Sequence, residues 1–166
     1  PHAMLTPGMR HAFDNGVAQL IVAGAQALLQ LPGQDGAPGP QLLQVAAQRF
    51  IEAEPLRDEV FGPCSLLVRC ANLAEVLAVL KCIGGTLTTT LWGVDEDTED
   101  HRALVRAATA VAGRVLFSGV PTGVAVSAGQ HHGGPWPAST APMTTSVGDA
   151  ALSRFLRPVC LQDAPA

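Results

Sequence analysis

The sequence predicts an α/β fold in which a mostly parallel sheet lies between layers of helices. Strand-like and helix-like segments alternate in the middle of the chain, at 64–71, 72–80, 85–93, 99–113 and 114–119. Parallel strands need a long crossover, and a helix packed on a face of the sheet supplies it. Hydrophobic residues make up 48% of the 166 residues, enough for the core of one domain. We therefore expect a three-layer αβα arrangement.

The N-terminal part predicts a helix that starts at Thr6 and ends near Gly24. Thr6 is a suitable N-cap, and Pro7 suits the first helical position, where no N–H is needed. Apolar residues then recur at spacings of three and four, on one helical face: Met9, Phe13, Val17 and Leu20. A short strand at 26–31 and a Pro/Gly-rich loop at 32–40 follow. Residues 41–51 fit a strand or a helix equally well.

The alternating region has clear start and stop signals. Residues 64–71, "CSLLVRCA", have the continuous apolar character of a buried strand. Asn72 and Glu75 form a capping pair for the next helix, and the threonine-rich strand 85–93 is bounded by glycines. Acidic residues open the helix 99–113, which Gly113 is expected to close before the strand 114–119.

The C-terminal part differs in composition. Residues 121–148 are rich in Gly, Pro, Ser and Thr and predict a long irregular loop. Loops of this length in a compact domain are usually functional or disordered. A short helix at 149–156 and a terminal strand at 157–162 are expected to close the fold.

Charge, hydropathy and cysteine use exclude several classes of function. A net charge of −4 without a run of Lys or Arg predicts no nucleic-acid partner. The apolar stretch 17–29 is shorter than the roughly 20 residues of a membrane span, so we expect no membrane partner. The cysteines form no Cys-x-x-Cys pair and predict reduced, inert thiols in a cytoplasmic protein: Cys64, Cys70, Cys82 and Cys160.

Metal and phosphate sites are not expected either. His131 and His132 are adjacent, so their side chains should diverge, and the other histidines lack ligand spacing. The sequence contains none of the glycine-rich phosphate-binding motifs. A small metal- or ligand-binding module built on His131 and His132 is the weaker alternative. The Gly133-Gly134-Pro135 turn indicates a close approach of the main chain to a ligand or to another segment.

Several segments resemble a known family in the family's own order. "EVFGP" at 59–63 resembles a motif of the aldehyde dehydrogenase superfamily, in which Glu and Ile or Val precede Phe-Gly-Pro. Residues 132–162 resemble the tail of one branch, the NADP-preferring α-ketoglutarate semialdehyde (2,5-dioxovalerate) dehydrogenases, and 4–9 and 113–126 are also similar to that branch. The resemblance implies a partial aldehyde-dehydrogenase catalytic domain.

The resemblance assigns roles to individual residues. It implies that Glu59 accepts hydrogen bonds from the nicotinamide ribose of NADP or NAD, and that Phe61 packs near the nicotinamide. From the residues alone, a solvated Glu and a core Phe before a strand are the simpler interpretation. The loop 121–135 would form part of the aldehyde entrance, with His132, Gly133, Gly134 and Trp136 at or beside it, although packing explains Trp136 equally well. "HGGPWPAST" replaces the polar Gly-Gly-x-Lys-x-Ser-Gly of many family members.

The family's cofactor domain and nucleophile motif have no counterpart in residues 1–166, so we expect the C-terminal portion of a catalytic domain with no catalytic residue of its own. The implied complete enzyme oxidises an aldehyde, expected to be 2-oxoglutarate semialdehyde, to the carboxylate. Homo-oligomerisation through the terminal segment is implied for it. The segment alone is expected to be inactive and to bind the cofactor weakly or not at all. A non-catalytic remnant that serves as an interaction or oligomerisation module is the alternative.

Overall fold

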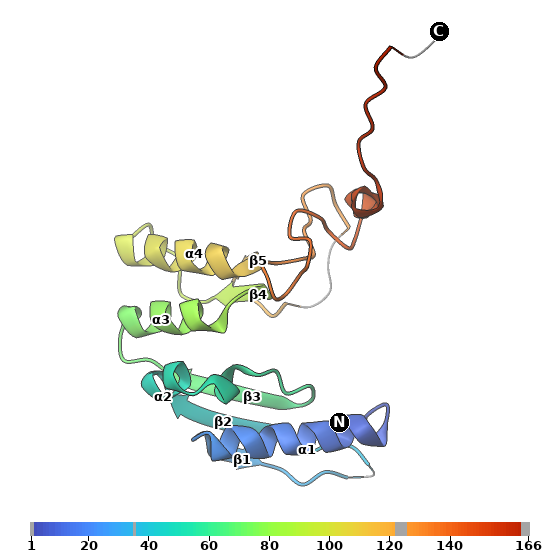
Figure 1. Ribbon diagram of the computed structural model, residues 1–166. Coiled ribbons are helices and arrows are strands. Elements are labelled where there is room, and N and C mark those ends of the chain that lie inside the picture. Colours follow the sequence, from blue (N-terminus) through green and yellow to red (C-terminus); the bar gives the residue numbers. More distant parts are fainter. Residues whose placement is uncertain (1, 35, 122–125, 164–166) are drawn as a thin grey trace. The chain divides into compact units, whose positions relative to one another are not determined.

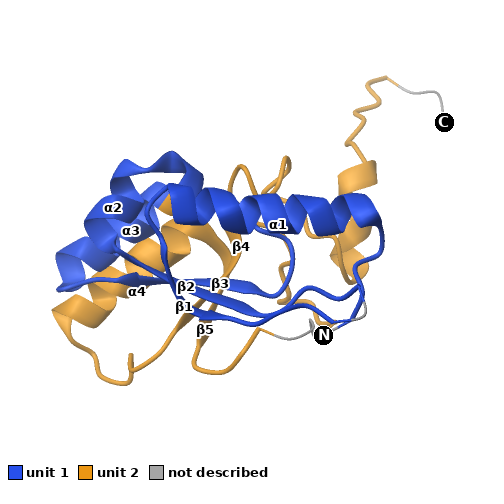
Figure 2. Cartoon of the chain, turned by 90° about the horizontal axis from the view of Figure 1, so that it is seen from below, with its two compact units in different colours: residues 1–82 blue, residues 83–166 orange. Residues whose placement is uncertain are grey.

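The computed structural model describes residues 2–34, 36–121 and 126–163 (Figure 1). Two compact units divide the chain, Pro1–Cys82 and Ile83–Ala166, and each is described by itself (Figure 2). Each unit contains its own hydrogen-bonded sheet. Helices and a parallel strand pair in each unit confirm the expected α/β fold.

Unit 1 is a three-stranded sheet with helices. Its elements are α1 (Pro7–Val22), β1 (Gln26–Gln30), β2 (Gln41–Ala46), α2 (Ala47–Glu52), the 3-10 helix η1 (Glu54–Arg57), β3 (Cys64–Arg69) and α3 (Leu73–Ile83), whose last residue lies beyond the unit boundary. The strand order is β1-β2-β3, with β1 antiparallel and β3 parallel to β2. The ambiguous segment 41–51 is thus a strand followed by a helix. The predicted N-cap is confirmed, since Thr6 Oγ1 accepts from the Met9 N–H at 3.2 Å.

The core of unit 1 lies on one face of its sheet. Leu43 and Val45 of β2 point into it and pack with Leu20 of α1 and Phe50 of α2. Leu43 is completely buried, and burying such a side chain contributes about 2 kcal/mol. The opposite face carries leucines that stay 37–48% exposed: Leu29, Leu42 and Leu67. The described core of unit 1 thus lies between its sheet and its helices.

Unit 2 is built around a parallel β-α-β element. Strand β4 (Thr86–Leu91) is followed by α4 (Glu99–Val111) and β5 (Ala112–Phe117), and β4 and β5 pair in parallel with Thr88 opposite Arg114. Thr98 Oγ1 caps α4 by accepting from the His101 N–H at 3.1 Å. Helix α4 ends at Val111, two residues before the predicted Gly113 cap. The crossover predicted from the sequence is confirmed for this pair.

The C-terminal part contains little regular structure, as predicted. Its described residues form turns and the 3-10 helix η2 (Asp149–Phe155). The terminal strand predicted at 157–162 is not formed, and all six residues are exposed. A strand needs a neighbouring backbone to complete its hydrogen bonds, and the described residues offer none to this segment. No helix in the described parts of the chain has the length and hydropathy needed to cross a bilayer.

Candidate functional site

Residues 58–63 form an irregular segment between η1 and β3, and two glycines hold it close to α1. A Cβ on Gly16 of α1 would lie 3.0 Å from Val60 Cγ2, so this glycine lets Val60 pack against the helix. Gly62 adopts φ of +147°, and a Cβ there would lie 2.8 Å from Cε2 of the buried Phe13. Glycine accepts this backbone conformation and leaves room for the ring. Gly62 and Pro63 thus bend the chain into β3.

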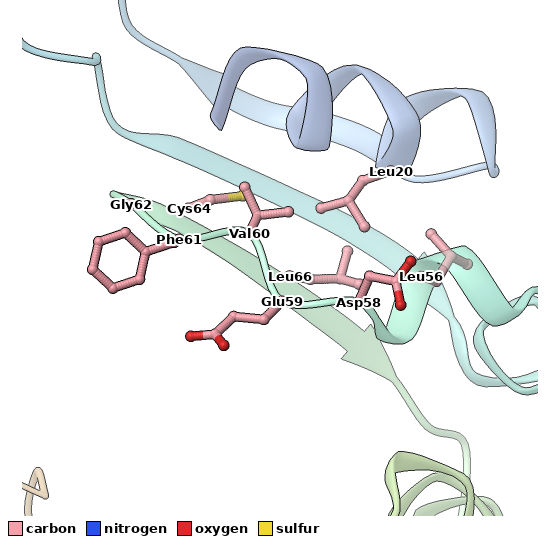
Figure 3. A pocket seen from close by; sticks show the side chains of 9 residues that line it. All are labelled: Leu20, Leu56, Asp58, Glu59, Val60, Phe61, Gly62, Cys64 and Leu66. Carbon is pink, nitrogen blue, oxygen red and sulfur yellow. The ribbon is translucent and has the colours of Figure 1, made fainter. Parts of the chain in front are cut away.

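Glu59 and Phe61 project to the same side of this segment, and Val60 points the other way, toward Leu20 (Figure 3). This agrees with the alternation expected of an extended segment. Phe61 is 66% exposed, which is unusual for a large aromatic side chain. Among the described residues, none donates a hydrogen bond to the Glu59 carboxylate or forms an ion pair with it. Both side chains are therefore available to a ligand.

The two side chains line one hollow of about 460 Å³. Its other lining residues are Leu20, Leu56, Asp58, Val60, Gly62, Cys64 and Leu66. Asp58 was not expected at the site, and its position next to Glu59 is the only signal that the sequence offered. The lining of the hollow thus contains two carboxylates, those of Asp58 and Glu59, together with several apolar side chains (Figure 3). A carboxylate accepts two hydroxyl donors at once, and an exposed ring can pack on a flat group, so the arrangement suits a sugar joined to an aromatic ring.

Two of the cysteines, Cys64 and Cys70, are poorly suited to act as nucleophiles. Cys64 lines the hollow, but burial raises the pKa of its thiol above the usual value. The pKa of the Cys70 thiol is also raised, first by burial and then by the negative charge of Glu75. A thiol must ionise to attack an aldehyde, so both groups are poor nucleophiles at neutral pH. The described residues contain no group of three or more His, Cys, Asp or Glu side chains that could hold a metal ion.

Two of the residues predicted at the aldehyde entrance are buried glycines with a packing role. Gly133 and Gly134 are buried, and their backbone packs closely on unit 2: a Cβ on Gly113 would lie 2.9 Å from Gly134 Cα. A Cβ on Gly134 would lie 3.2 Å from the Thr86 carbonyl carbon. These glycines therefore allow two segments of main chain to touch. Residues 122–125 of the predicted entrance loop lie outside the described residues.

His132 and Gly133 line a second hollow, of about 410 Å³, and Trp136 does not. The Trp136 ring is 72% exposed. The His132 N–H donates to Thr145 Oγ1 at 2.9 Å, and its Nδ1 lies 2.8 Å from Ser146 Oγ. Of the four residues predicted at the entrance, the structure thus brings His132 and Gly133 to one concave surface.

Comparisons of the fold and of the sequence with known proteins both find aldehyde dehydrogenases. No family model matches the chain. A salicylaldehyde dehydrogenase from Pseudomonas putida G7 superposes with a TM-score of 0.68 over 96% of this chain and 32% of its own, at 18% identity. An NAD-dependent aldehyde dehydrogenase from Sinorhizobium meliloti superposes with a TM-score of 0.57 over 92% of this chain and 29% of its own, at 17% identity. The chain therefore has the α/β fold of part of an aldehyde dehydrogenase.

The sequence comparison is more specific. The chain is 42% identical to alpha-ketoglutaric semialdehyde dehydrogenase 2 of Azospirillum brasilense and 37% identical to alpha-ketoglutaric semialdehyde dehydrogenase of Acinetobacter baylyi, in each case over 98% of its length. The resemblance to α-ketoglutarate semialdehyde dehydrogenases is confirmed, and the comparison does not test the NADP preference. The chain spans about a third of the length of these relatives, 31% and 32%.

Proposed function

We propose that this chain is a segment of a nicotinamide-dependent aldehyde dehydrogenase, and that its part in the reaction is to position the nicotinamide ribose through Glu59 and the nicotinamide through Phe61. The observation that carries the proposal is the common direction of these two side chains beside a hollow (Figure 3). The similarity to semialdehyde dehydrogenases over 98% of the chain supports the reaction type, and 2-oxoglutarate semialdehyde is the proposed substrate.

The residues at the hollow fit the proposed cofactor. Glu59 offers two oxygen acceptors with no partner among the described residues, which matches the two hydroxyls of a ribose. Phe61 presents an exposed ring two residues further on. A bound NADP or NAD would accept a hydride from the substrate. The solved neighbour from Sinorhizobium meliloti is NAD-dependent, which supports a nicotinamide cofactor in general terms.

Positioning is the contribution that these residues can make to the rate. Hydride donor and acceptor must be held near contact distance, and small displacements of bound reactants slow such steps strongly. Val60 and Gly62 fix the segment against α1, so Glu59 and Phe61 start from a defined backbone. The thiolate nucleophile and the oxyanion donors would come from other parts of the complete enzyme.

Unit 1 also shows a surface suited to the rest of such an enzyme. Leu29, Leu42 and Leu67 share the uncovered face of the sheet, and β3 pairs only with β2 among the described strands. We propose that the remaining part of the enzyme covers this face, which would bury the leucines. The exposed segment 157–162 is the proposed contact between subunits of a homo-oligomer, because an unpaired extended segment can join the edge of a sheet.

The test is the substitution Glu59→Gln in the complete enzyme, with single-turnover measurement of NADPH or NADH formation. Loss of one charged hydrogen-bond acceptor should slow hydride transfer about tenfold or more, and should change aldehyde binding less. Glu54→Gln is the matched control, because Glu54 is also an exposed acid of unit 1 and does not line the hollow. The proposal assigns it no contact with the ribose, so its effect should be much smaller.

Two results would contradict the proposal. An unchanged single-turnover rate in the Glu59→Gln enzyme would contradict the proposed contact between Glu59 and the ribose. If the wild-type complete enzyme reduced neither NADP⁺ nor NAD⁺ with any aldehyde, the proposed dehydrogenase activity itself would be contradicted.

A further inference from the structure

An apolar hollow on unit 1 places two of the chain's three methionines beside Phe61. Met4 and Met9 line it, and its volume is about 430 Å³. Its other lining residues include a single polar side chain, that of His2: His2, Ala3, Leu5, Pro38, Phe61 and Pro63. Thioether sulfur makes favourable contacts with aromatic rings, so Met4 and Met9 suit a hollow that Phe61 also lines.

Both methionines border the segment that carries Glu59 and Phe61. Met9 also lines a neighbouring hollow of about 290 Å³, to which Glu59 and Phe61 contribute as well. Met4 packs over Gly62, since a Cβ on this glycine would lie 3.1 Å from Met4 Cε. A chemical change in either methionine would therefore be felt directly by this segment.

The surroundings of Met4 and Met9 suit a reduced thioether and not its oxidised form. Both residues are half-buried, so a small peroxide can approach them while they still pack against the segment. Oxidation converts methionine into a polar sulfoxide, and a polar group packed among apolar side chains is costly unless it finds a donor. The hollow offers one side-chain donor, the His2 ring. On the other side of Met9, the Glu59 carboxylate is only an acceptor when it is ionised.

We propose that Met4 and Met9 form a peroxide-sensitive modification site, at which oxidation to the sulfoxide displaces Phe61 and weakens cofactor binding. The effect on the cofactor rests on the proposed function, whereas the modification itself does not. The sulfoxides would leave these hollows for water, and Phe61 would lose the packing that holds its ring beside them.

The modification needs a hydroperoxide and no other reactant. The sulfur lone pair attacks one peroxide oxygen, an S–O bond forms and the O–O bond breaks. The proton on the transferred oxygen passes to the departing oxygen, which leaves as water or as an alcohol. The sulfur is thus oxidised by two electrons and the peroxide is reduced by two.

The experiment treats the complete enzyme with hydrogen peroxide and then with excess thiol, which reverses sulfenic acids and disulfides of cysteine but leaves methionine sulfoxide. Peptide mass spectrometry measures oxidation at each methionine, and equilibrium dialysis measures the Kd of NADP⁺ and of NAD⁺ before and after treatment. In the wild-type enzyme the Kd should rise about 3- to 10-fold, the range expected for the loss of a sulfur–aromatic contact.

Two variants show whether these sulfurs are responsible. Met4→Leu combined with Met9→Leu keeps nearly the same apolar volume and cannot be oxidised, so peroxide should change its Kd by less than about twofold. Met143→Leu is the matched control, because Met143 is 94% exposed, belongs to unit 2 and lines neither hollow. Peroxide should raise the Kd of this control as much as that of the wild-type enzyme.

Three results would overturn the site. They are an equal rise in Kd in the wild-type enzyme and the double variant, an unchanged Kd when both methionines are oxidised, and reduced Met4 and Met9 when Met143 is fully oxidised. A wild-type enzyme that binds neither nucleotide before treatment would contradict the proposed function instead. Urea unfolding of this chain then decides on the site: peroxide should lower the midpoint followed by circular dichroism by about 0.3–1 M, and the double variant should abolish this shift. A midpoint that does not move would overturn the site.

Discussion

The position of Glu59 and Phe61 depends on Gly62, and Gly62→Ala should destabilise unit 1 clearly. The backbone of Gly62 has φ of +147°, where a residue with a Cβ is strained by about 1–3 kcal/mol. The new Cβ would also lie 2.8 Å from Phe13 Cε2 and 3.1 Å from Met4 Cε. Phe13 is 3% exposed and cannot move freely, so overpacking adds about 1–3 kcal/mol. The two terms together give a loss of about 2–6 kcal/mol.

Urea unfolding of this chain, followed by circular dichroism at 222 nm, measures the effect. The helical signal includes α1, α2 and most of α3, which belong to unit 1, whereas both tryptophans, Trp92 and Trp136, belong to unit 2. The shift of the unfolding midpoint should therefore be smaller by tryptophan fluorescence than by circular dichroism. Gly129→Ala is the control, because its Cβ would meet no atom within 4 Å and its φ is not in the positive region. A loss below about 0.5 kcal/mol for Gly62→Ala would refute the packing described for this segment.

Two further predictions concern titratable groups. The exposed Cys160 should react with a thiol reagent at pH 8 well before Cys64, because burial raises the pKa of the Cys64 thiol. Mass spectrometry of labelled peptides measures the two rates, and equal rates would contradict the described burial of Cys64. Hydrogen bonds from Arg106 and then Arg102 lower the pKa of Glu99, so this carboxylate stabilises the fold above its unfolded pKa and ceases to do so as the pH falls through its folded pKa. Glu99→Gln should therefore lower the free energy of unfolding at pH 7, and this loss should disappear in acid below the usual Glu pKa. The control Glu96→Gln removes no described side-chain pair, so its effect should not depend on pH. Urea titrations at pH 7 and at the acidic pH measure both variants.

Elements with strong local signals were predictable from the sequence. The cap at Thr6 and the apolar spacing after it identify α1, and Asn72 with Glu75 identifies the start of α3, where Asn72 Oδ1 accepts from the Glu75 N–H at 3.0 Å. Both signals act within a few residues, so no tertiary information is needed to read them. Residues 41–51 were ambiguous because a strand and a helix meet there without a turn residue, and packing around Leu43 and Phe50 decides the boundary.

The pairing of the strands with one another could not be predicted from local signals of this kind. Periodicity shows that 64–69 and 86–91 are strands, but it does not show which backbone each of them meets. The expected terminal strand at 157–162 failed for the same reason, because its partner is not among the described residues. At the site, the common direction of Glu59 and Phe61 follows from the alternation of an extended segment. The roles of both residues came from a resemblance and are proposals.

The exposed apolar face of unit 1 bears on whether the chain is a self-contained module or a piece of an enzyme. Leu29, Leu42 and Leu67 lie on this face of the sheet and stay 37–48% exposed. Large apolar side chains gathered on one exposed face usually mark a surface that binds another part of a protein. An independent interaction module would carry this face as a liability, whereas relatives about three times as long have further residues that could cover it. The apolar face therefore favours the proposed dehydrogenase segment over the non-catalytic remnant.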